Sequence, residues 1–274
     1  MRDWRNYTLQ KLEELNKRAI KSEGQNFCIR YRTINQIVKQ ADISPAEYVL
    51  EIGGGLGILT HALSLTGARI DVYETDQILF NHLEEEFKSL DTVTIFAEDA
   101  LNANWPENIR LVSNLPYQHS SKFIIKFLHH QATDAYFMLQ KEFAIRCIAS
   151  PGTKEYGRLS ILCQLHSKVI KILDVPSDAF FPKPKVHSSV LHFTRQELET
   201  QNDHKDIELL TNNLFTLKRR VLRSVLRGFL KRKNVSEECW EKVPYHDKRI
   251  NELTAIDLDE ILSFLKQNQC WPLA

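Results

Sequence analysis

The stretch Tyr48-Val49-Leu50-Glu51-Ile52-Gly53-Gly54-Gly55-Leu56-Gly57-Ile58-Leu59-Thr60 decides the fold class of this chain. An apolar run of strand length leads into four glycines, and a helical pattern follows through Leu63 and Leu65. The glycines allow a tight turn and leave no side chain between the backbone and a bound molecule, with a helix amino terminus just behind them. The stretch therefore predicts a strand, a nucleotide-type binding loop and a helix.

The spacing of these glycines distinguishes between cofactors. Dinucleotide enzymes carry the pattern Gly-x-Gly-x-x-Gly. Here the glycines fall at Gly53, Gly55 and Gly57, and the acidic Glu51 lies in the strand before them. This arrangement indicates S-adenosylmethionine rather than a dinucleotide.

Acidic residues follow the next two predicted strands. The strand over residues 69–73 ends at Glu74, about twenty residues beyond the glycine loop, where a carboxylate accepts hydrogen bonds from both ribose hydroxyls. The strand over residues 92–96 leads to Asp99, which is placed to accept a hydrogen bond from an adenine amino group. Asp76 is expected instead to cap a helix that begins at Gln77.

A fourth apolar run, residues 109–113, leads into the loop Asn114-Leu115-Pro116-Tyr117, and a helical run over residues 120–130 follows. The Asn114 amide both donates and accepts, Pro116 fixes the backbone, and Tyr117 offers a flat ring with a polar tip. These groups together suit a planar heterocycle that bears an amine. A plain strand, turn and core tyrosine is the alternative interpretation of the tetrapeptide alone.

The remaining segments complete an α/β protein with a doubly wound, Rossmann-like sheet. A helix over residues 33–41 follows a turn or lid that contains Asn26. Later segments are a strand, a helix and two β-rich runs, over residues 135–139, 141–149, 159–175 and 188–193. Three prolines exclude regular structure from the loop between the β-rich runs, and at least one of its neighbouring Phe180 and Phe181 should be buried.

The chain ends are expected to be helical. Residues 7–20 predict an amphipathic amino-terminal helix, and a polar linker over residues 195–206 precedes a helix over 214–230 and a final helix over 256–265. The domains expected are an amino-terminal arm, a Rossmann-like methyltransferase domain and a small all-helical domain, over residues 1–22, 23–195 and 196–274. The helix over 214–230 brings four cations to one face and indicates a footprint for RNA phosphates: Arg220, Arg223, Arg227 and Lys231.

Composition is that of an ordinary globular protein, with 274 residues of which 43% are hydrophobic and 26% charged. No apolar run reaches the roughly 18 residues of a membrane span, and the amino terminus is polar and charged. We therefore expect a cytoplasmic protein that does not contact the membrane. Five widely spaced cysteines without a Cys-x-x-Cys pair indicate reduced thiols, with no disulfide framework and no metal site.

Taken together, these motifs resemble those of the ribosomal RNA adenine dimethyltransferase family, the kasugamycin-resistance type that modifies small-subunit ribosomal RNA. Each marker is weak alone, but the ordered set spans nearly the whole chain. The markers are Gly24-Gln25-Asn26-Phe27, the stretch from Leu50 to Gly57, Glu98-Asp99-Ala100, Asn114-Leu115-Pro116-Tyr117, Leu139-Gln140-Lys141-Glu142, Tyr156-Gly157-Arg158-Leu159-Ser160, Phe180 through Val186, Lys218-Arg219-Arg220-Val221-Leu222-Arg223 and Arg249-Ile250-Asn251-Glu252-Leu253.

The resemblance implies an S-adenosylmethionine site formed by Asn26, the Cys28 backbone, Gly53, Glu74, Asp99 and Asn114. It also implies an adenine pocket formed by Asn114, Leu115, Pro116, Tyr117 and Phe180. The reaction implied is dimethylation of two adjacent adenosines near the 3′ end of small-subunit RNA, in a ribosomal assembly intermediate. A monomer is expected.

Three departures from the family pattern affect the expected substrate more than the cofactor. Gly54 stands where proline is common, Cys28 where leucine is common, and Gln118-His119-Ser120-Ser121 where Asn-Ile-Ser-Thr is usual. Three other functions stay open at this point. They are an erythromycin-resistance-type methyltransferase of large-subunit RNA, a non-catalytic assembly or transcription factor of the same fold, and a small-molecule or protein methyltransferase.

Overall fold

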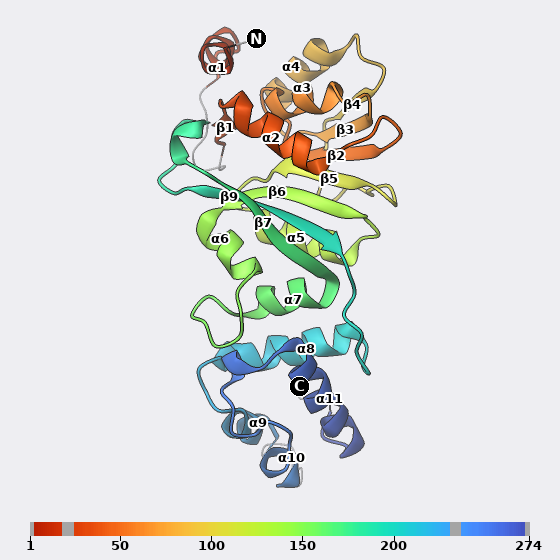
Figure 1. Cartoon of the computed structure of the whole chain (residues 1–274), viewed down its shortest axis with the longest axis vertical. Coiled ribbons are helices and arrows are strands. Elements are labelled where there is room, and N and C mark those ends of the chain that lie inside the picture. The colour runs from red at the N-terminus through yellow and green to blue at the C-terminus, as the bar shows by residue number, and fades with distance from the viewer. Residues whose placement is uncertain (1–2, 18–24, 231–236, 272–274) are drawn as a thin grey trace. The chain divides into compact units, whose positions relative to one another are not determined.

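The computed structural model describes residues 3–17, 25–230 and 237–271 (Figure 1). Its contacts divide the chain into two compact units. The sheet unit comprises residues 1–144 and 169–195, and the helical unit comprises residues 145–168 and 196–274. Residues 145–168 thus lie with the C-terminal segment rather than with the sheet, because Ile161 and Leu165 are buried in the same apolar cluster as Ile207 and Leu210.

The elements follow the βα alternation that the sequence predicted. In chain order they are α1 (Trp4–Glu14), β1 (Phe27–Cys28), α2 (Tyr31–Ala41), β2 (Tyr48–Ile52), α3 (Ile58–Ser64), β3 (Arg69–Tyr73), α4 (Gln77–Phe87), β4 (Val93–Phe96), β5 (Arg110–Asn114), α5 (Ser120–His129), β6 (Asp134–Gln140), α6 (Lys141–Cys147), α7 (Arg158–His166), β7 (Ser167–Val175), η2 (Ser177–Ala179), β8 (Phe180–Phe181), β9 (Ser188–Arg195), α8 (His204–Leu214), η3 (Phe215–Leu217), α9 (Leu222–Leu230), α10 (Glu238–Glu241), η5 (Ile250–Glu252) and α11 (Ala255–Gln267).

The main sheet has seven strands in the order β4-β3-β2-β5-β6-β9-β7. The first five are parallel, and β9 pairs antiparallel with β6. Helices α3 and α4 lie on one face and α5 on the other (Figure 1), as right-handed crossovers require when the strand order reverses at β2. Both faces of β2 are therefore covered, which explains why Val49, Leu50, Glu51 and Ile52 are all buried. The predicted doubly wound, Rossmann-like sheet is confirmed.

A second sheet of two short strands joins distant parts of the sheet unit. In β1 and β8, Phe27 pairs with Phe181 and Cys28 with Phe180 in antiparallel register. This pairing fixes the segment that contains Asn26 against the proline-rich loop, about 150 residues further along the chain.

Helix α1 begins at a cap formed by Asp3, whose carboxylate accepts from the backbone N–H groups of Arg5 and Asn6. Trp4 of α1 is buried and stacks on Tyr31 at a centroid distance of 5.9 Å. Leu12 packs in a cluster with Phe27 and Leu56. The predicted arm is therefore a docked helix. The last part of that predicted arm, residues 18–22, lies outside the described residues.

One predicted β-rich segment is wrong, because its first part is a helix of the helical unit. Residues 159–166 were expected to be β-rich, but they form α7. Most of these residues are buried and five of the eight are apolar, and such a run does not distinguish a buried strand from a buried helix. The N–H of Gly157 donates to Ser160 Oγ at 3.1 Å and closes the first turn, which settles the helical alternative.

The predicted helix over residues 214–230 is also divided. A 3-10 turn, η3, ends at Leu217, and α9 begins only at Leu222. The backbone between them hydrogen bonds to η5, since the N–H of Ile250 donates to the Arg220 carbonyl at 3.0 Å. The final predicted helix is confirmed as α11, which Thr254 caps through reciprocal bonds to Asp257.

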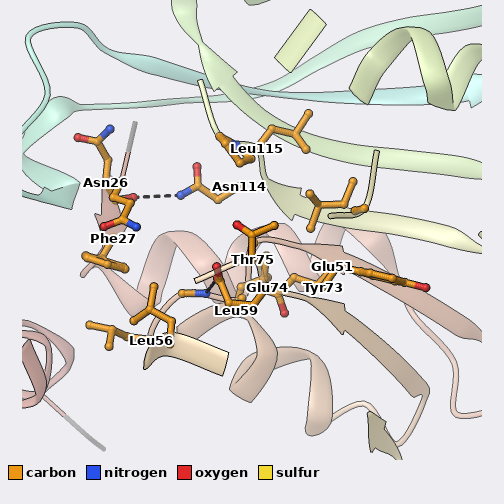
Figure 2. Close-up of a pocket in the computed structure, with 18 of the residues that line it drawn as sticks. Asn26, Phe27, Glu51, Leu56, Leu59, Tyr73, Glu74, Thr75, Asn114 and Leu115 are labelled. Carbon is orange, nitrogen blue, oxygen red and sulfur yellow. Dashed lines mark hydrogen bonds between the residues drawn. The ribbon is translucent and has the colours of Figure 1, made fainter. Parts of the chain in front are cut away.

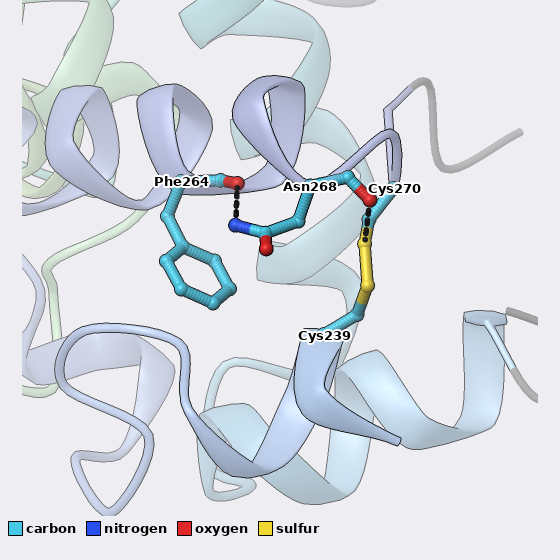
Figure 3. The surroundings of a disulfide bond; sticks show 4 residues. All are labelled: Cys239, Phe264, Asn268 and Cys270. Atoms are coloured by element: carbon cyan, nitrogen blue, oxygen red, sulfur yellow. Dashed lines mark hydrogen bonds between the residues drawn. A yellow bond between two sulfur atoms is a disulfide. The ribbon is translucent and has the colours of Figure 1, made fainter. Parts of the chain in front are cut away.

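A disulfide bond joins Cys239 and Cys270 in the helical unit (Figure 3). The expectation of five reduced thiols was therefore wrong for this pair, while Cys28, Cys147 and Cys163 are free and buried. The separation of 31 residues gave no sequence signal. Only the fold of α10 and the end of α11 brings the two cysteines together. Within the described residues, no helix is long and apolar enough to cross a membrane.

Candidate cofactor and base-binding site

A cavity of about 320 Å³ opens at the carboxyl ends of β2, β3 and β5 (Figure 2). Cavities of this size and position hold small ligands in doubly wound sheets. The predicted site residues that line it are Asn26, Cys28, Gly53, Glu74, Asp99, Asn114, Leu115, Pro116 and Tyr117. The structure thus brings together residues that lie up to 91 positions apart in the sequence.

The glycine loop forms the floor of the cavity. Gly53, Gly55 and Gly57 all have positive φ, at +76°, +58° and +80°, which other residues rarely adopt. Gly54 has ordinary φ, but a Cβ built there would lie 2.6 Å from Val72 Cγ1. With Val72 on the neighbouring strand, a side chain at position 54, including the proline that is common in the family pattern, would therefore clash.

Glu74 lies at the end of β3 and is buried. Its Oε2 accepts from the Gly55 N–H and its Oε1 from the Asp76 N–H, both at 3.0 Å. Burial raises the pKa of this carboxyl, although the two N–H donors oppose the shift. The carboxylate is thereby held in one orientation beside the glycine loop. Asp76 is the helix cap that the sequence predicted, since its Oδ1 accepts from the Ile78 and Leu79 N–H groups.

Glu51 also lines the cavity, where no role was predicted for it beyond its place in the motif. Its carboxyl is buried and accepts a 2.7 Å hydrogen bond from Thr60 Oγ1. Burial raises the pKa of Glu51 well above its ordinary value, and the charge of Glu74 adds to the shift. An acidic residue inside an otherwise apolar strand was the sequence signal for a second carboxyl in this site.

Asp99 lies beyond the end of β4 at the rim of the cavity. Its Oδ1 accepts from the Leu101 N–H at 2.9 Å, so the carboxylate begins a tight turn. The Asp99 carboxylate is therefore placed where it can contact one end of a ligand in the cavity.

Asn114 links two walls of the cavity. Its Nδ2 donates to the Asn26 carbonyl at 3.2 Å (Figure 2). Its Oδ1 is buried, and the described part of the chain offers it no hydrogen-bond partner. A buried acceptor without a donor is costly unless a ligand supplies one. This atom therefore marks the place where a ligand donor fits.

The loop after Asn114 forms the other side of the cavity. Leu115 is buried, whereas Pro116 and Tyr117 are partly exposed there. The Tyr117 hydroxyl shares a 2.7 Å hydrogen bond with Ser188 Oγ at the start of β9. Burial raises the pKa of Tyr117, so the phenol stays neutral near neutral pH.

One predicted residue differs from its expected surroundings. Phe180 is not among the residues that line the cavity, and its side chain is 2% exposed and packs in the main core with Val175 and Val190. The Cys28 thiol is also buried, and burial raises its pKa to about 11. Cys28 therefore presents no reactive thiolate to the cavity.

The predicted basic stripe is altered by the division of the helix. Arg223 and Arg227 are exposed one turn apart on α9, while Arg220 is exposed in the segment before it. Arg223 pairs with Asp247 at 3.4 Å, and both side chains are exposed. The fourth cation, Lys231, lies outside the described residues.

The parallel sheet, the glycine loop and the acidic strand ends define a Rossmann-like, S-adenosylmethionine-dependent methyltransferase. The model of the ribosomal RNA adenine dimethylase family matches residues 16–269 of this chain. The chain therefore belongs to this family, as the motifs predicted.

Curated relatives agree with this assignment. The chain is 37% identical over 262 residues to a probable ribosomal RNA small subunit methyltransferase A of Thermococcus onnurineus, covering 92% of this chain and 94% of the relative. It is 36% identical to the ribosomal RNA small subunit methyltransferase A of Thermotoga maritima, over 80% of this chain and 78% of the relative. Among solved structures, a dimethyladenosine transferase from Plasmodium falciparum has a TM-score of 0.76 at 25% identity, covering 87% of this chain and 96% of that one.

The residues present fit S-adenosylmethionine. Gly53, Gly54 and Gly55 line the cavity without side chains, the carboxyls of Glu51 and Glu74 line it as acceptors suited to the hydroxyls and positive charge of this cofactor, and the Asn114 oxygen lacks a donor among the described residues.

Proposed function

We propose that this protein transfers methyl groups from S-adenosylmethionine to the exocyclic amines of adenosines in small-subunit ribosomal RNA, two to each of two adjacent adenosines near the 3′ end. The observation that carries the proposal is the buried, unpartnered Oδ1 of Asn114 at the end of β5. Family membership and the small-subunit methyltransferase names of the relatives support the choice of substrate.

The cofactor supplies an electrophilic methyl carbon: as the adenine nitrogen forms a bond to it, the carbon–sulfur bond breaks, and sulfur keeps the electron pair as a neutral thioether. The adenine amine is a weak nucleophile because its lone pair is delocalised into the ring. Asn114 Oδ1 and the Leu115 carbonyl accept hydrogen bonds from the amine hydrogens and favour a pyramidal nitrogen with its lone pair towards the methyl group. The proton that leaves the nitrogen passes to water.

Tyr117 holds the flipped base by stacking. Its ring stands beside Asn114, and the hydrogen bond to Ser188 fixes the phenol end of the ring. A base extruded from RNA loses its stacking neighbours, and an aromatic side chain replaces them. Phe180 was expected to share this role, but its burial in the core leaves Tyr117 as the stacking ring of this proposal.

The cofactor contacts follow the strand ends. Glu74 receives the ribose hydroxyls, Asp99 receives the adenine amino group of the cofactor, and the Gly53 backbone, Cys28 backbone and Asn26 border the rest of the molecule. The N–H groups of Gly55 and Asp76 each donate one hydrogen bond to Glu74, and this carboxyl lines the cavity. Asn114 lines the same cavity as the glycine loop and Tyr117, so we assign it to both ligands.

The RNA contacts are assigned to the helical unit. Arg220, Arg223 and Arg227 are exposed, and we assign the binding of the phosphate backbone to these arginines and to Lys231, which lies outside the described residues. We further propose that the RNA is presented by a small-subunit assembly intermediate, and that the protein acts as a monomer in the cytoplasm, without a metal.

The test is methyl transfer from labelled S-adenosylmethionine to purified small and large ribosomal subunits and to protein-free RNA, followed by mapping of the modified bases. Paired dimethyladenosines in the small subunit are expected. A single modified adenine in large-subunit RNA would instead select a resistance methyltransferase. Tight subunit binding without transfer would select a non-catalytic assembly factor, and Asn114→Ala serves as the control for background transfer.

A further inference from the structure

We infer that Lys126 is a positioning residue for the cofactor, because it fixes from outside the cavity the turn that carries Asp99. This inference rests on the proposed contact between Asp99 and the adenine of the cofactor. It adds a residue that lies on α5 and does not line the cavity.

The ammonium of Lys126 is fully engaged by one short segment. Its Nζ donates to the carbonyl oxygens of Ala100, Leu101 and Ala103, at 2.7, 3.0 and 2.5 Å. A lysine ammonium has three N–H donors, so all of them are used on the turn that follows Asp99. The same ammonium lies 4.4 Å from the centroid of the Trp105 ring.

Asp99 is held in this turn by hydrogen bonds. The Asp99 carbonyl accepts from the N–H groups of Asn102 and Ala103, and its Oδ1 accepts from the Leu101 N–H. Trp105 Nε1 donates to the Ala100 carbonyl at 2.9 Å and closes the segment from the other end. Residues 99–105 therefore form one hydrogen-bonded body, and Lys126 anchors it to α5, with a further bond between the Trp105 carbonyl and the ring of His130 at the end of that helix.

The positive charge of Lys126 is required as well as its three hydrogen bonds. Three carbonyl dipoles that converge on one point repel each other unless a cation lies between them. Burial lowers the pKa of Lys126, while the negative charges of Asp99 and Glu98 oppose that shift. A methionine of similar length fills the space but leaves the three carbonyls unneutralised. The turn then relaxes, and the Asp99 carboxylate leaves the position at which it meets the adenine.

The experiment compares two ligands by calorimetry: S-adenosylhomocysteine and its purine analogue, which lacks the adenine amino group. A hydrogen bond to a carboxylate predicts that the wild-type protein prefers the amino ligand by about tenfold or more. Asp99→Asn and Lys126→Met should both reduce this preference to about threefold or less, and Lys126→Arg should restore much of it. The exposed Lys122, one turn earlier on α5, provides the matched control Lys122→Met, which should keep the wild-type preference.

The preference is the ratio of the affinities of one variant for the two ligands, so it depends only on molecules that are folded and bind ligand. Lys126→Gln is measured beside Lys126→Met in case the methionine variant does not fold. A wild-type preference in both, with the preference lost in Asp99→Asn, would overturn the role of Lys126 and leave the proposed function intact. Equal binding of the two ligands to the wild-type protein would overturn the assignment of Asp99, and the positioning role with it.

Discussion

Asn114 Nδ2 donates to the main-chain carbonyl of Asn26 at 3.2 Å, across 88 residues of sequence. This bond joins the end of β5 to the segment before β1 and fixes the orientation of the Asn114 amide. The amide is thus oriented before any ligand binds, and the remaining acceptor is reserved for a donor that the described residues do not supply.

The first prediction concerns this amide. Asn114→Ala should lower kcat for methyl transfer by about 100-fold or more, because removing one preorganised polar group next to the reacting atoms has that typical cost. The affinity for S-adenosylmethionine should fall by less than about tenfold. Single-turnover transfer and calorimetry check the two values, and Asn81→Ala on the exposed face of α4 is the control. Equal losses in both would make Asn114 a cofactor contact only.

The second prediction concerns the tyrosine ring. Ser188→Ala removes the hydrogen bond that fixes the Tyr117 hydroxyl and should raise KM for RNA several-fold while leaving cofactor affinity unchanged. Ser189→Ala is the matched control, since the neighbouring Ser189 Oγ donates to Asp174 and not to Tyr117. An identical effect of the two substitutions on KM would show that the loss comes from β9 rather than from the ring.

The third prediction concerns stability and pH. The folded-state pKa of Glu51 is raised by burial, so the native protein binds more protons than the unfolded chain once the pH exceeds the ordinary glutamate value of about 4.3. Stability contributed by this group is then lost as the pH rises towards the folded-state pKa. Glu51→Gln removes the titration, and its stability relative to wild type should increase over that range. Denaturant unfolding at several pH values checks this, with Glu85→Gln on the exposed face of α4 as control. A constant difference would contradict it.

The fourth prediction concerns RNA binding. Replacing Arg223 and Arg227 by glutamine should weaken binding of the small subunit and reduce the salt slope by about 1 for each phosphate that is no longer neutralised. Asp247→Asn should have the opposite sign, because it releases Arg223 from its ion pair. The exposed Lys205 on α8 provides the control Lys205→Gln. Unchanged binding in the double variant would remove α9 from the RNA surface, and cofactor affinity should stay constant throughout.

The fifth prediction concerns the disulfide. Denatured protein without reductant should expose three thiols, and five after reduction. A bridge across 31 residues restricts the unfolded chain, so Cys239→Ser should lower the free energy of unfolding by about 3 to 4 kcal/mol under oxidising conditions. In reductant, the variant and the wild type should unfold alike. Five reactive thiols before reduction would contradict the bridge.

The sequence was sufficient for the parallel part of the sheet and for most of the cavity. The strand over residues 69–73 and the start of α4 at Gln77 were predicted at their observed positions, because a buried run, an Asp cap and glycines are local signals. The carboxyl ends of parallel strands share one edge, so Glu74, Asp99 and Asn114 were expected to meet.

By itself, the sequence therefore determined the positions of those groups that depend on local backbone chemistry. The tertiary structure decided the rest: the burial of Phe180, the helix at residues 158–166, the break before α9, and the approach of Cys239 to Cys270. It also placed Lys126 beneath the Asp99 turn. Each of these depends on contacts between residues far apart in the chain, and the free energy of such contacts outweighs the small local preferences that a sequence pattern records.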